Sequence, residues 1–295
     1  MPVLDGSRVR RSELELKGAG SGRPFPGFHM IRDITIGQYV PGDSLLHRAD
    51  PRTKIILTFV MMIFIFMINT YWGYLLLTLF TALTVVSSNI PVKFVLKGLK
   101  PIIFIVIFAG VINMFTIRGT PIFQYGFIRP TYEGLDVAIK MAIRLFLLII
   151  IAGLLTYTTT PIVLTDGIEK LMGPLGKIKV PVHEIAMMMT IALRFIPTLL
   201  EETDKIIKAQ SSRGADFDSG NIIERAKSFI PVLVPLFISA FRRADELATA
   251  MEARCYRGSE GRTRMKQLSF TRNDLVVTVI TAIFMAWVLV MQYVI

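Results

Sequence analysis

The stretch from Ile55 to Ser88 contains no charged residue. A helix of about 20 apolar residues crosses a bilayer, so this stretch is too long for a single crossing. The segment Asn69–Gly73 interrupts it near its middle, and the Tyr71 and Trp72 within that segment are residue types that favour the membrane–water interface. We therefore expect a helical hairpin, in which one helix crosses to about Asn69 and the next returns from about Trp72.

The composition agrees with a membrane protein. Apolar residues make up 53% of the 295 residues and charged residues only 19%, while the formal net charge is +11. The basic residues lie between apolar runs, as they do on the cytoplasmic side of membrane proteins, so this charge does not indicate nucleic-acid binding. Cys255 is the single cysteine, which excludes an intrachain disulfide. Because the whole chain has only this cysteine and three histidines, a structural zinc site is not expected.

The pattern predicts an all-α membrane protein with about five transmembrane helices and long cytoplasmic amphipathic helices. Residues 1–36 are interpreted as a tag-like or disordered extension, because they lack the apolar stretch of a signal peptide. Residues 37–157 are expected to form an N-terminal membrane domain of four spans, residues 158–272 a cytoplasmic region and residues 273–295 the final transmembrane helix. The five expected spans are 55–69, 72–88, 101–116, 137–157 and 275–295.

Charge in the loops predicts the orientation of the spans. Basic residues flank the hairpin at both ends, and because Lys and Arg accumulate in cytoplasmic loops, the N-terminus and the region 158–272 are expected in the cytoplasm. The alternative for the first basic group is an ordinary solvated loop. The loop 117–136 is neutral, which fits the outside. The residues that carry the bias are Arg48, Arg52, Lys54, Lys93, Lys97 and Lys100.

Arg144 lies inside the fourth expected span. A charge at that depth is costly, so it needs a partner or a watery groove. The alternative is a side chain that extends to the lipid headgroups.

The region 158–272 contains 17 Lys/Arg and 13 Asp/Glu and, in our interpretation, no clean span. A helix through Ile196, Leu200 and Ile207 carries charges on its opposite face, which is typical of an amphipathic helix. Gly214 is expected to end this helix. A second helix follows from Ile222, and prolines at 231 and 235 are expected to kink it. A short helix is also expected from Asp166 to Leu171, closed by Gly173–Pro174.

Both long helices are expected to end in a small residue, an arginine and another small residue. We call Ser212-Arg213-Gly214 the first arginine tip and Ala253-Arg254-Cys255 the second arginine tip. A single arginine there is explained by the helix dipole, which contributes roughly 0.3–1 kcal/mol. Two such ends in one cytoplasmic region favour a different role. Because guanidinium groups fit carboxylates, the tips are predicted to dock into grooves on cytoplasmic proteins.

Motifs for catalysis are incomplete. The nearest match to a phosphate loop, Gly173–Ile178, has two residues between its glycines instead of four and no hydroxyl residue after Lys177. His183-Glu184 begins a metalloprotease motif, but Met187 occupies the place of the second histidine. The acidic run Glu201–Asp204 lacks the second acidic cluster that a membrane prenyltransferase would need. We expect no enzyme activity.

Four separated segments carry a family likeness: Ser44–Arg52, Ala192–Pro197, Gln210–Asp216 and Ala250–Gly258. With these segments in this order, the chain resembles the transmembrane T component of energy-coupling factor (ECF) transporters from about Gly37 onward. The chain departs from the family pattern at Ser212, where the family often has alanine, and at Cys255, where it has glycine. Neither departure removes an arginine.

The resemblance implies a non-catalytic coupling subunit of an ATP-driven importer of vitamins or other micronutrients in a prokaryotic cell membrane. The implied partners are two ABC ATPase subunits, which Arg213 and Arg254 would contact, and a small membrane-embedded substrate-capture subunit, the S component. ATP and Mg²⁺ would be bound by the ATPases, and this chain would bind no cofactor and no nucleic acid. The residues expected to meet the capture subunit are Met187, Met188, Ile196, Leu200, Phe229 and Leu233.

A conventional permease with its own substrate pathway is the alternative. Such a protein needs polar or broken helices near the middle of the membrane. The runs 55–88 and 101–116 contain no charge, which disfavours this alternative.

Overall fold

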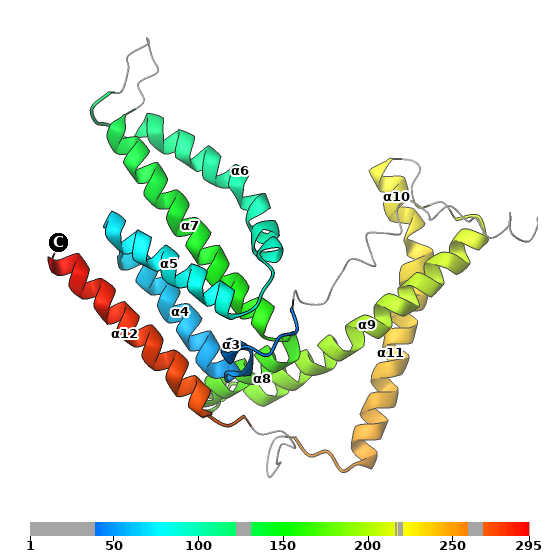
Figure 1. The fold of residues 1–295 in the computed structure, drawn as a ribbon. Helices are drawn as coiled ribbons and strands as arrows, with labels where there is room; N and C mark the ends of the chain where they lie inside the picture. The colour runs from blue at the N-terminus through cyan, green and yellow to red at the C-terminus, as the bar shows by residue number, and fades with distance from the viewer. Residues whose placement is uncertain (1–38, 122–130, 216, 218–220, 259–267, 295) are drawn as a thin grey trace, which may run out of the picture. The chain divides into compact units, whose positions relative to one another are not determined.

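The computed structural model describes residues 39–121, 131–215, 217, 221–258 and 268–294. The expected extension at residues 1–36 lies outside these residues. Within them the chain is helical apart from its turns and one isolated bridge between Pro121 and Thr131. The helices in Figure 1 are α3 (Leu45–Arg48), α4 (Pro51–Met67), α5 (Tyr71–Ser87), α6 (Val92–Thr116), α7 (Tyr132–Thr158), α8 (Pro161–Met172), η1 (Gly173–Ile178), α9 (Val182–Ser212), α10 (Ile222–Ser228), α11 (Ile230–Ala253) and α12 (Arg272–Val294).

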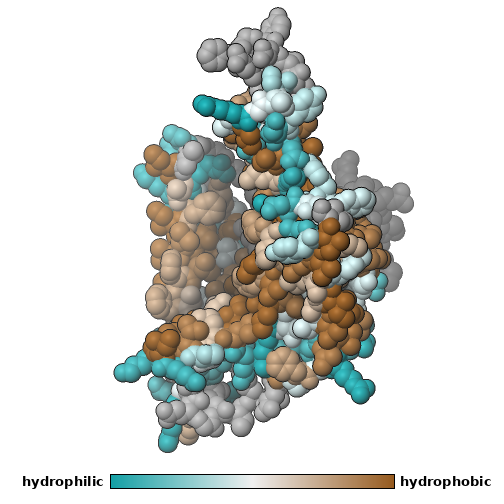
Figure 2. Space-filling view, turned by 90° about the vertical axis from the view of Figure 1, so that its left-hand side faces the viewer, coloured by the Kyte–Doolittle hydropathy of each residue, from teal (hydrophilic) through white to brown (hydrophobic). Residues whose placement is uncertain are grey.

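The prediction of an all-α membrane protein is confirmed. Among the described residues, four helices are long and apolar enough to cross a membrane, namely α6, α7, α9 and α12, and α5 is a shorter apolar helix. Hydrophobic residues also make up much of the surface drawn in Figure 2. Such a surface suits a protein whose surroundings are lipid rather than water.

The predicted hairpin is present. Helix α4 ends at Met67 and α5 begins at Tyr71, so the turn falls where the sequence predicts it. Ile68 is fully buried, and the hydroxyl of Tyr74 donates to its carbonyl at 2.7 Å. A Cβ on Gly73 would lie 2.6 Å from the Ile68 side chain. The turn therefore requires glycine at position 73 because the backbone of α5 passes directly over Ile68.

Two spans begin earlier than expected. Helix α6 starts at Val92 rather than at Pro101, and Pro101 lies inside it. Its lysines therefore belong to the helix, where long basic side chains can extend toward the headgroups. Helix α7 starts at Tyr132 rather than at 137. Its first turns hold Asp136 and Lys140, an ion pair of 2.7 Å at the i, i+4 spacing.

The region 158–272 differs from the expectation in three respects. Helix α9 meets the length and composition of a span, since Glu184 and Arg194 are the only acidic or Lys/Arg residues between Val182 and Leu200. The second helix is divided in two: α10 ends at Ser228 and α11 begins at Ile230, which puts Pro231 in the first turn of α11, where a missing N–H costs little, while Pro235 lies inside α11. The helix expected at 166–171 is present but begins earlier, as α8 from Pro161; it ends at Met172 with Gly173 as its C-cap, as predicted, and residues 173–178 continue as a 3₁₀ helix.

The structure divides into two compact units. The larger one comprises residues 37–196 and 250–295, and the smaller one includes residues 197–249. The core of the larger unit lies where α4, α5, α7 and α12 run side by side (Figure 1). Phe64, Leu77 and Leu147 are buried there, and Phe80 of α5 stacks on Phe284 of α12 with ring centroids 4.1 Å apart.

Candidate functional site: two arginine-capped helix ends

The first arginine tip is held by backbone hydrogen bonds. Gly214 has a φ of +89°, a left-handed conformation that glycine adopts without strain. Its N–H donates to the carbonyl of Ser211 at 3.0 Å, and the N–H of Ala215 donates to Gln210 at 3.0 Å. These two bonds define a Schellman motif, which places Arg213 at the C-cap of α9. The prediction that Gly214 ends the helix is confirmed.

The second arginine tip has the same geometry. Cys255 has a φ of +56° although it carries a Cβ. Its N–H donates to Glu252 at 2.8 Å, and the N–H of Tyr256 donates to Met251 at 3.0 Å. This is again a Schellman motif, with Arg254 at the C-cap of α11. The two arginines therefore occupy the same position in two copies of one backbone structure.

Both arginine side chains are exposed, as are Ser212, Gly214, Ala253 and Cys255. Within the described part of the chain, no ion pair of 4.0 Å or less involves Arg213 or Arg254. The hydroxyl of Ser212 donates to the carbonyl of Lys208 at 2.9 Å, so its hydrogen is used within α9. Each tip therefore presents a guanidinium group that is available to a carboxylate on another molecule.

Helix α11 carries an uncovered apolar face in the smaller unit. This apolar stripe follows the i, i+3, i+4 spacing, so its members share one side of the helix. Its six residues, all exposed, are Ile230, Leu233, Val234, Phe237, Ile238 and Phe241. A contiguous apolar surface of this kind marks a contact with another protein or with lipid.

Polar contacts hold α11 against the later part of α9 in the same unit. Arg243 donates to the carboxylate of Glu202 at 2.9 Å, and the amide of Gln210 donates to the carbonyl of Pro231 at 3.3 Å. The rings of Phe217 and Phe229 lie 5.3 Å apart.

The residues expected at the capture-subunit surface differ in exposure. Ile196, Phe229 and Leu233 are exposed, as is Met188, whereas Met187 and Leu200 are half-buried. Only Leu233 of the six belongs to the apolar stripe. The other members of the stripe were missed, although their helical spacing is readable in the sequence.

Several polar residues in the larger unit make hydrogen bonds that stabilise the unit itself. The buried ammonium group of Lys54 donates to the carbonyls of His47 and Thr158, both at 3.1 Å, and to the hydroxyl of Thr159 at 3.2 Å. Three donors meet three acceptors, so Lys54 fastens the end of α7 to the start of α4. In the sequence, Lys54 serves only as an orientation signal, and no neighbouring residue indicates this structural role.

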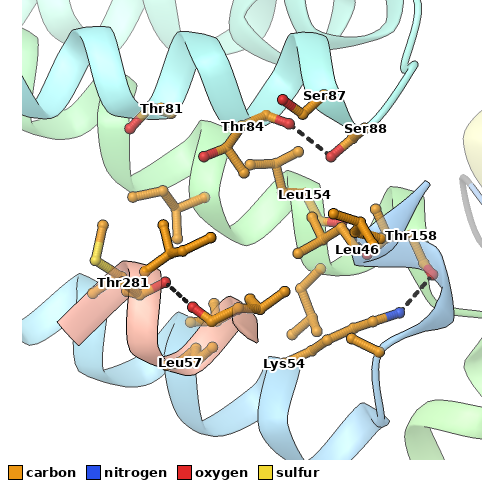
Figure 3. Close-up of a pocket in the computed structure, with 18 of the residues that line it drawn as sticks. Leu46, Lys54, Leu57, Thr81, Thr84, Ser87, Ser88, Leu154, Thr158 and Thr281 are labelled. Atoms are coloured by element: carbon orange, nitrogen blue, oxygen red, sulfur yellow. Dashed lines mark hydrogen bonds between the residues drawn. The ribbon is translucent and has the colours of Figure 1, made fainter. Parts of the chain in front are cut away.

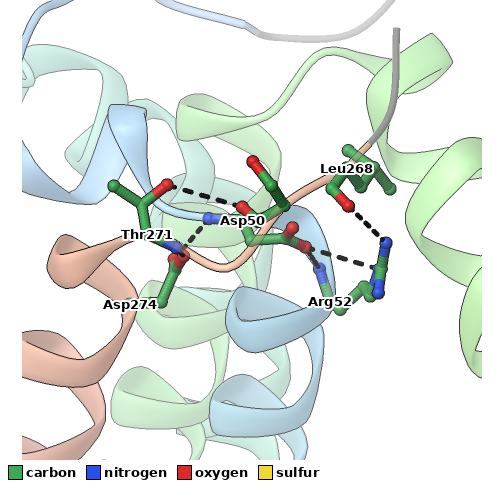
Figure 4. A network of polar contacts seen from close by, with 6 residues as sticks. Asp50, Arg52, Leu268, Thr271 and Asp274 are labelled. Carbon is green, nitrogen blue, oxygen red and sulfur yellow. Dashed lines mark hydrogen bonds and ion pairs between the residues drawn. The ribbon is translucent and has the colours of Figure 1, made fainter.

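A second network joins the start of α4 to the start of α12 (Figure 4). Asp50 caps α4 by accepting the N–H of Arg52 at 2.9 Å. Asp274 accepts the N–H of Asp50 at 2.5 Å and the N–H of Thr271 at 2.6 Å. Arg52 in turn donates to the carbonyl of Leu268 at 3.1 Å. The pattern Thr271-x-x-Asp274 is a readable capping box, but its link to Asp50 is not visible in the sequence.

One end of the Arg144 side chain has several hydrogen-bond partners. Its guanidinium donates to the hydroxyl of Tyr74 at 2.8 Å, to the carbonyl of Ile68 at 3.3 Å and to the side chain of Asn69 at 3.4 Å, and it lies over the ring of Phe66. These groups belong to the hairpin turn. Arg144 therefore ties α7 to the turn between α4 and α5.

No cluster of three or more His, Cys, Asp or Glu that could hold a metal ion occurs among the residues that the structure describes.

Comparison with known proteins identifies the family to which the chain is similar. The family model described as "Cobalt transport protein" (CbiQ) matches residues 42–265. The chain is 84% identical to the energy-coupling factor transporter transmembrane protein EcfT of Ruminiclostridium cellulolyticum over 90% of this chain and 99% of that protein. It is 56% identical to EcfT of Clostridium kluyveri, over 84% of this chain and 92% of that one, and 53% identical to EcfT of Bacillus subtilis, over 85% and 95%.

These matches run through both arginine tips and leave no basis for the permease alternative. The chain belongs to the CbiQ/EcfT family and is a multi-pass membrane protein, the non-catalytic transmembrane coupling component of an energy-coupling factor transporter.

Proposed function

We propose that the chain couples two ABC ATPase subunits to a membrane-embedded S component, with one arginine tip docked on each ATPase. The single observation that carries the proposal is the repeated geometry of the tips. Arg213 and Arg254 each sit at the C-cap of a Schellman motif, with a left-handed residue immediately after them. Two equal contacts suit two equal partners.

The chemistry of the tips fits such docking. A guanidinium at a helix C-terminus brings its charge beside carbonyl groups that lack intrahelical partners. A groove lined by carboxylates would take both the side chain and the polar end of the helix. ATP and Mg²⁺ would bind to the ATPases, since this chain has no phosphate loop.

The S component would lie on the apolar stripe of α11 and on the exposed side chains of α9. Large apolar side chains exposed side by side are unfavourable in water but supply area for a membrane partner. Met188 on α9 adds an unbranched, adaptable side chain. Met187 and Leu200 are half-buried, and we assign each of them a supporting role within its own unit.

The proposed orientation and division of labour follow the sequence. Residues 37–157 and 273–295 would anchor the chain in the membrane, and residues 158–272 would do the coupling. Basic residues at the ends of α3 and α6, such as Arg48 and Lys93, would face the cytoplasm. Both arginine tips would then be on the side where ATP is hydrolysed.

Substitution of the tips tests the proposal. Arg213→Ala, Arg254→Ala and the double variant are expressed in the native host, and the ATPase recovered with each variant is quantified after detergent extraction. Truncating one partner of a docked charge pair typically costs ~2–5 kcal/mol, so each single variant should bind ATPase at least ~10-fold more weakly. The double variant should lose both ATPase binding and ATP-driven uptake.

The matched controls are Arg225→Ala and Arg257→Ala. Both side chains are exposed, and neither sits at a C-cap of α9 or α11. They should retain normal ATPase recovery. If the double tip variant assembles like these controls, the arginines only complement helix dipoles and the docking proposal is wrong.

A further inference from the structure

The larger unit contains a cavity of about 420 Å³ that its coupling role does not use. Residues of α3, α4, α5, α7 and α12 line it (Figure 3). Leu57, Phe80, Leu154 and Val277 supply apolar walls. The cavity lies wholly within the larger unit.

Five of the eight hydroxyl groups in the wall are already used. Thr81 donates to Leu77 at 2.8 Å, Thr84 to Phe80 at 2.8 Å and Ser88 to Thr84 at 2.7 Å. Thr158 and Thr281 donate in the same way to carbonyls of α7 and α12. Each of these hydroxyls bonds to the residue four positions earlier on its own helix. Their hydrogens are not available to a ligand.

Lys54 does not make the cavity a charged site. Although Lys54 is part of the wall, its ammonium already donates to the carbonyls of His47 and Thr158 and to the hydroxyl of Thr159. An ammonium group has three donors and all three are occupied. What remains for a ligand is a mostly apolar chamber, and apolar cavities in proteins take up apolar molecules.

The mouth of the cavity opens on the surface of the larger unit. Three wall residues from three different helices are more than half exposed: Leu45 of α3 at 58%, Leu83 of α5 at 58% and Ile280 of α12 at 53%. Helices α5 and α12 are apolar and α12 is long enough to cross a membrane. The molecules present at highest concentration beside such a mouth are membrane lipids.

We propose that this cavity is a binding site for a single acyl chain of a membrane lipid. The acyl chain of the lipid enters between Leu45, Leu83 and Ile280 and lies against Leu57 and Leu154. The shared chemistry is a long hydrocarbon, supplied either by a phospholipid tail or by a free fatty acid. The proposal depends on the membrane location of the chain and not on how the arginine tips dock.

A photoreactive fatty acid carrying an alkyne handle tests this. Cells that express the complete transporter incorporate the probe, membranes are irradiated, and the peptides of this chain that carry an adduct are identified by mass spectrometry. Adducts should concentrate on cavity-lining residues of α4, α5 and α12. The mass of the adduct distinguishes an intact phospholipid from a fatty acid.

Filling the cavity provides the decisive comparison. Thr84→Phe from α5 and Thr58→Phe from α4 each place a ring in the chamber. Each should lower cavity labelling about tenfold, the effect of ~1.4 kcal/mol of lost binding. Thr78→Phe is the matched control, because Thr78 is exposed on the same helix, bonds back to Tyr74 and does not line the cavity. Thr84→Val keeps the shape and should label normally.

Two results would overturn the proposal. One is labelling of the cavity residues no stronger than that of other lipid-facing residues, or labelling that Thr84→Phe and Thr58→Phe leave unchanged in normally folded protein. The other is labelling that appears in the isolated chain and disappears in the complete transporter, since a partner side chain would then be the occupant.

Discussion

The carboxylate of Asp274 accepts the backbone N–H of Asp50 at 2.5 Å, across 224 positions of sequence. Asp274 also accepts the N–H of Thr271, the residue immediately before its own helix, so one buried side chain serves the N-terminal ends of both α12 and α4. The first N–H groups of a helix have no partner within the helix, and a negative charge there is stabilising. Asp274 therefore fixes where α12 begins relative to α4.

Asp274→Asn is expected to destabilise the larger unit. The amide keeps one acceptor but turns an NH₂ group toward a backbone donor, which leaves a buried N–H unpaired at a cost of about 1–3 kcal/mol. Thermal unfolding in detergent, followed by helical circular dichroism, should show a midpoint several degrees lower. Asp43→Asn is the control, since the Asp43 side chain is 96% exposed. Equal midpoints for the two variants would contradict this role.

Cys255→Gly is expected to stabilise the second arginine tip. A non-glycine residue in the left-handed region costs roughly 1–2 kcal/mol, which glycine avoids. Conversely, Gly214→Ala should weaken the first tip by a similar amount. Amide hydrogen exchange at Tyr256 and Ala215, whose N–H groups close the two motifs, should slow in the first variant and quicken in the second. Cys255→Ala is the control. It retains a Cβ at the left-handed position, so the exchange rate at Tyr256 should stay near the native rate; slower exchange in this variant would contradict the explanation.

Lys54→Met is expected to loosen the junction between α4 and α7. The substitution keeps the apolar stem but leaves the carbonyls of His47 and Thr158 without their charged donor, and a hydrogen bond to a charged group contributes about 1.5–3 kcal/mol. The unfolding midpoint should fall, while Lys93→Met, at an exposed position on α6, should not lower it. A stable Lys54→Met variant would mean that water replaces the ammonium group.

Phe237→Ser and Ile238→Ser are expected to weaken recovery of the S component without affecting the ATPases. Burying one large apolar side chain contributes about 1.5–3 kcal/mol, so each loss should reduce S-component binding about tenfold or more. Ile223→Ser is the control, because Ile223 is as exposed as the stripe but lies on α10. Reduced recovery of both kinds of partner would instead indicate that α11 has unfolded.

The sequence predicts those features that local chemistry decides. The turn between Met67 and Tyr71 follows from the length of an apolar run and from interfacial aromatic residues. The end of α9 follows from Gly214, since only the left-handed conformation completes the cap. In both places a few neighbouring residues determine the backbone.

Features that depend on distant partners were missed. Nothing near Arg144 in the chain reveals that the turn after α4 supplies its acceptors. Nor does the sequence show that Asp274 reaches Asp50. The expected start of α6 was wrong because the charge-free run begins only after Lys100, whereas the helix already includes the three lysines before it and accommodates Pro101. Cys255 in a left-handed conformation is likewise visible only in the backbone geometry.

The backbone structure of the arginine tips affects how tightly each tip would bind a partner. Backbone bonds fix the helix ends, but the exposed side chains of Arg213 and Arg254 keep their rotamer freedom, which amounts to about 2 kcal/mol for an arginine. Each contact must overcome that entropy, so one tip alone should be a weak ligand. Joined in a single chain, the second tip binds at a high effective concentration once the first has bound. The assembly would gain avidity while each contact stays loose enough to shift during a transport cycle.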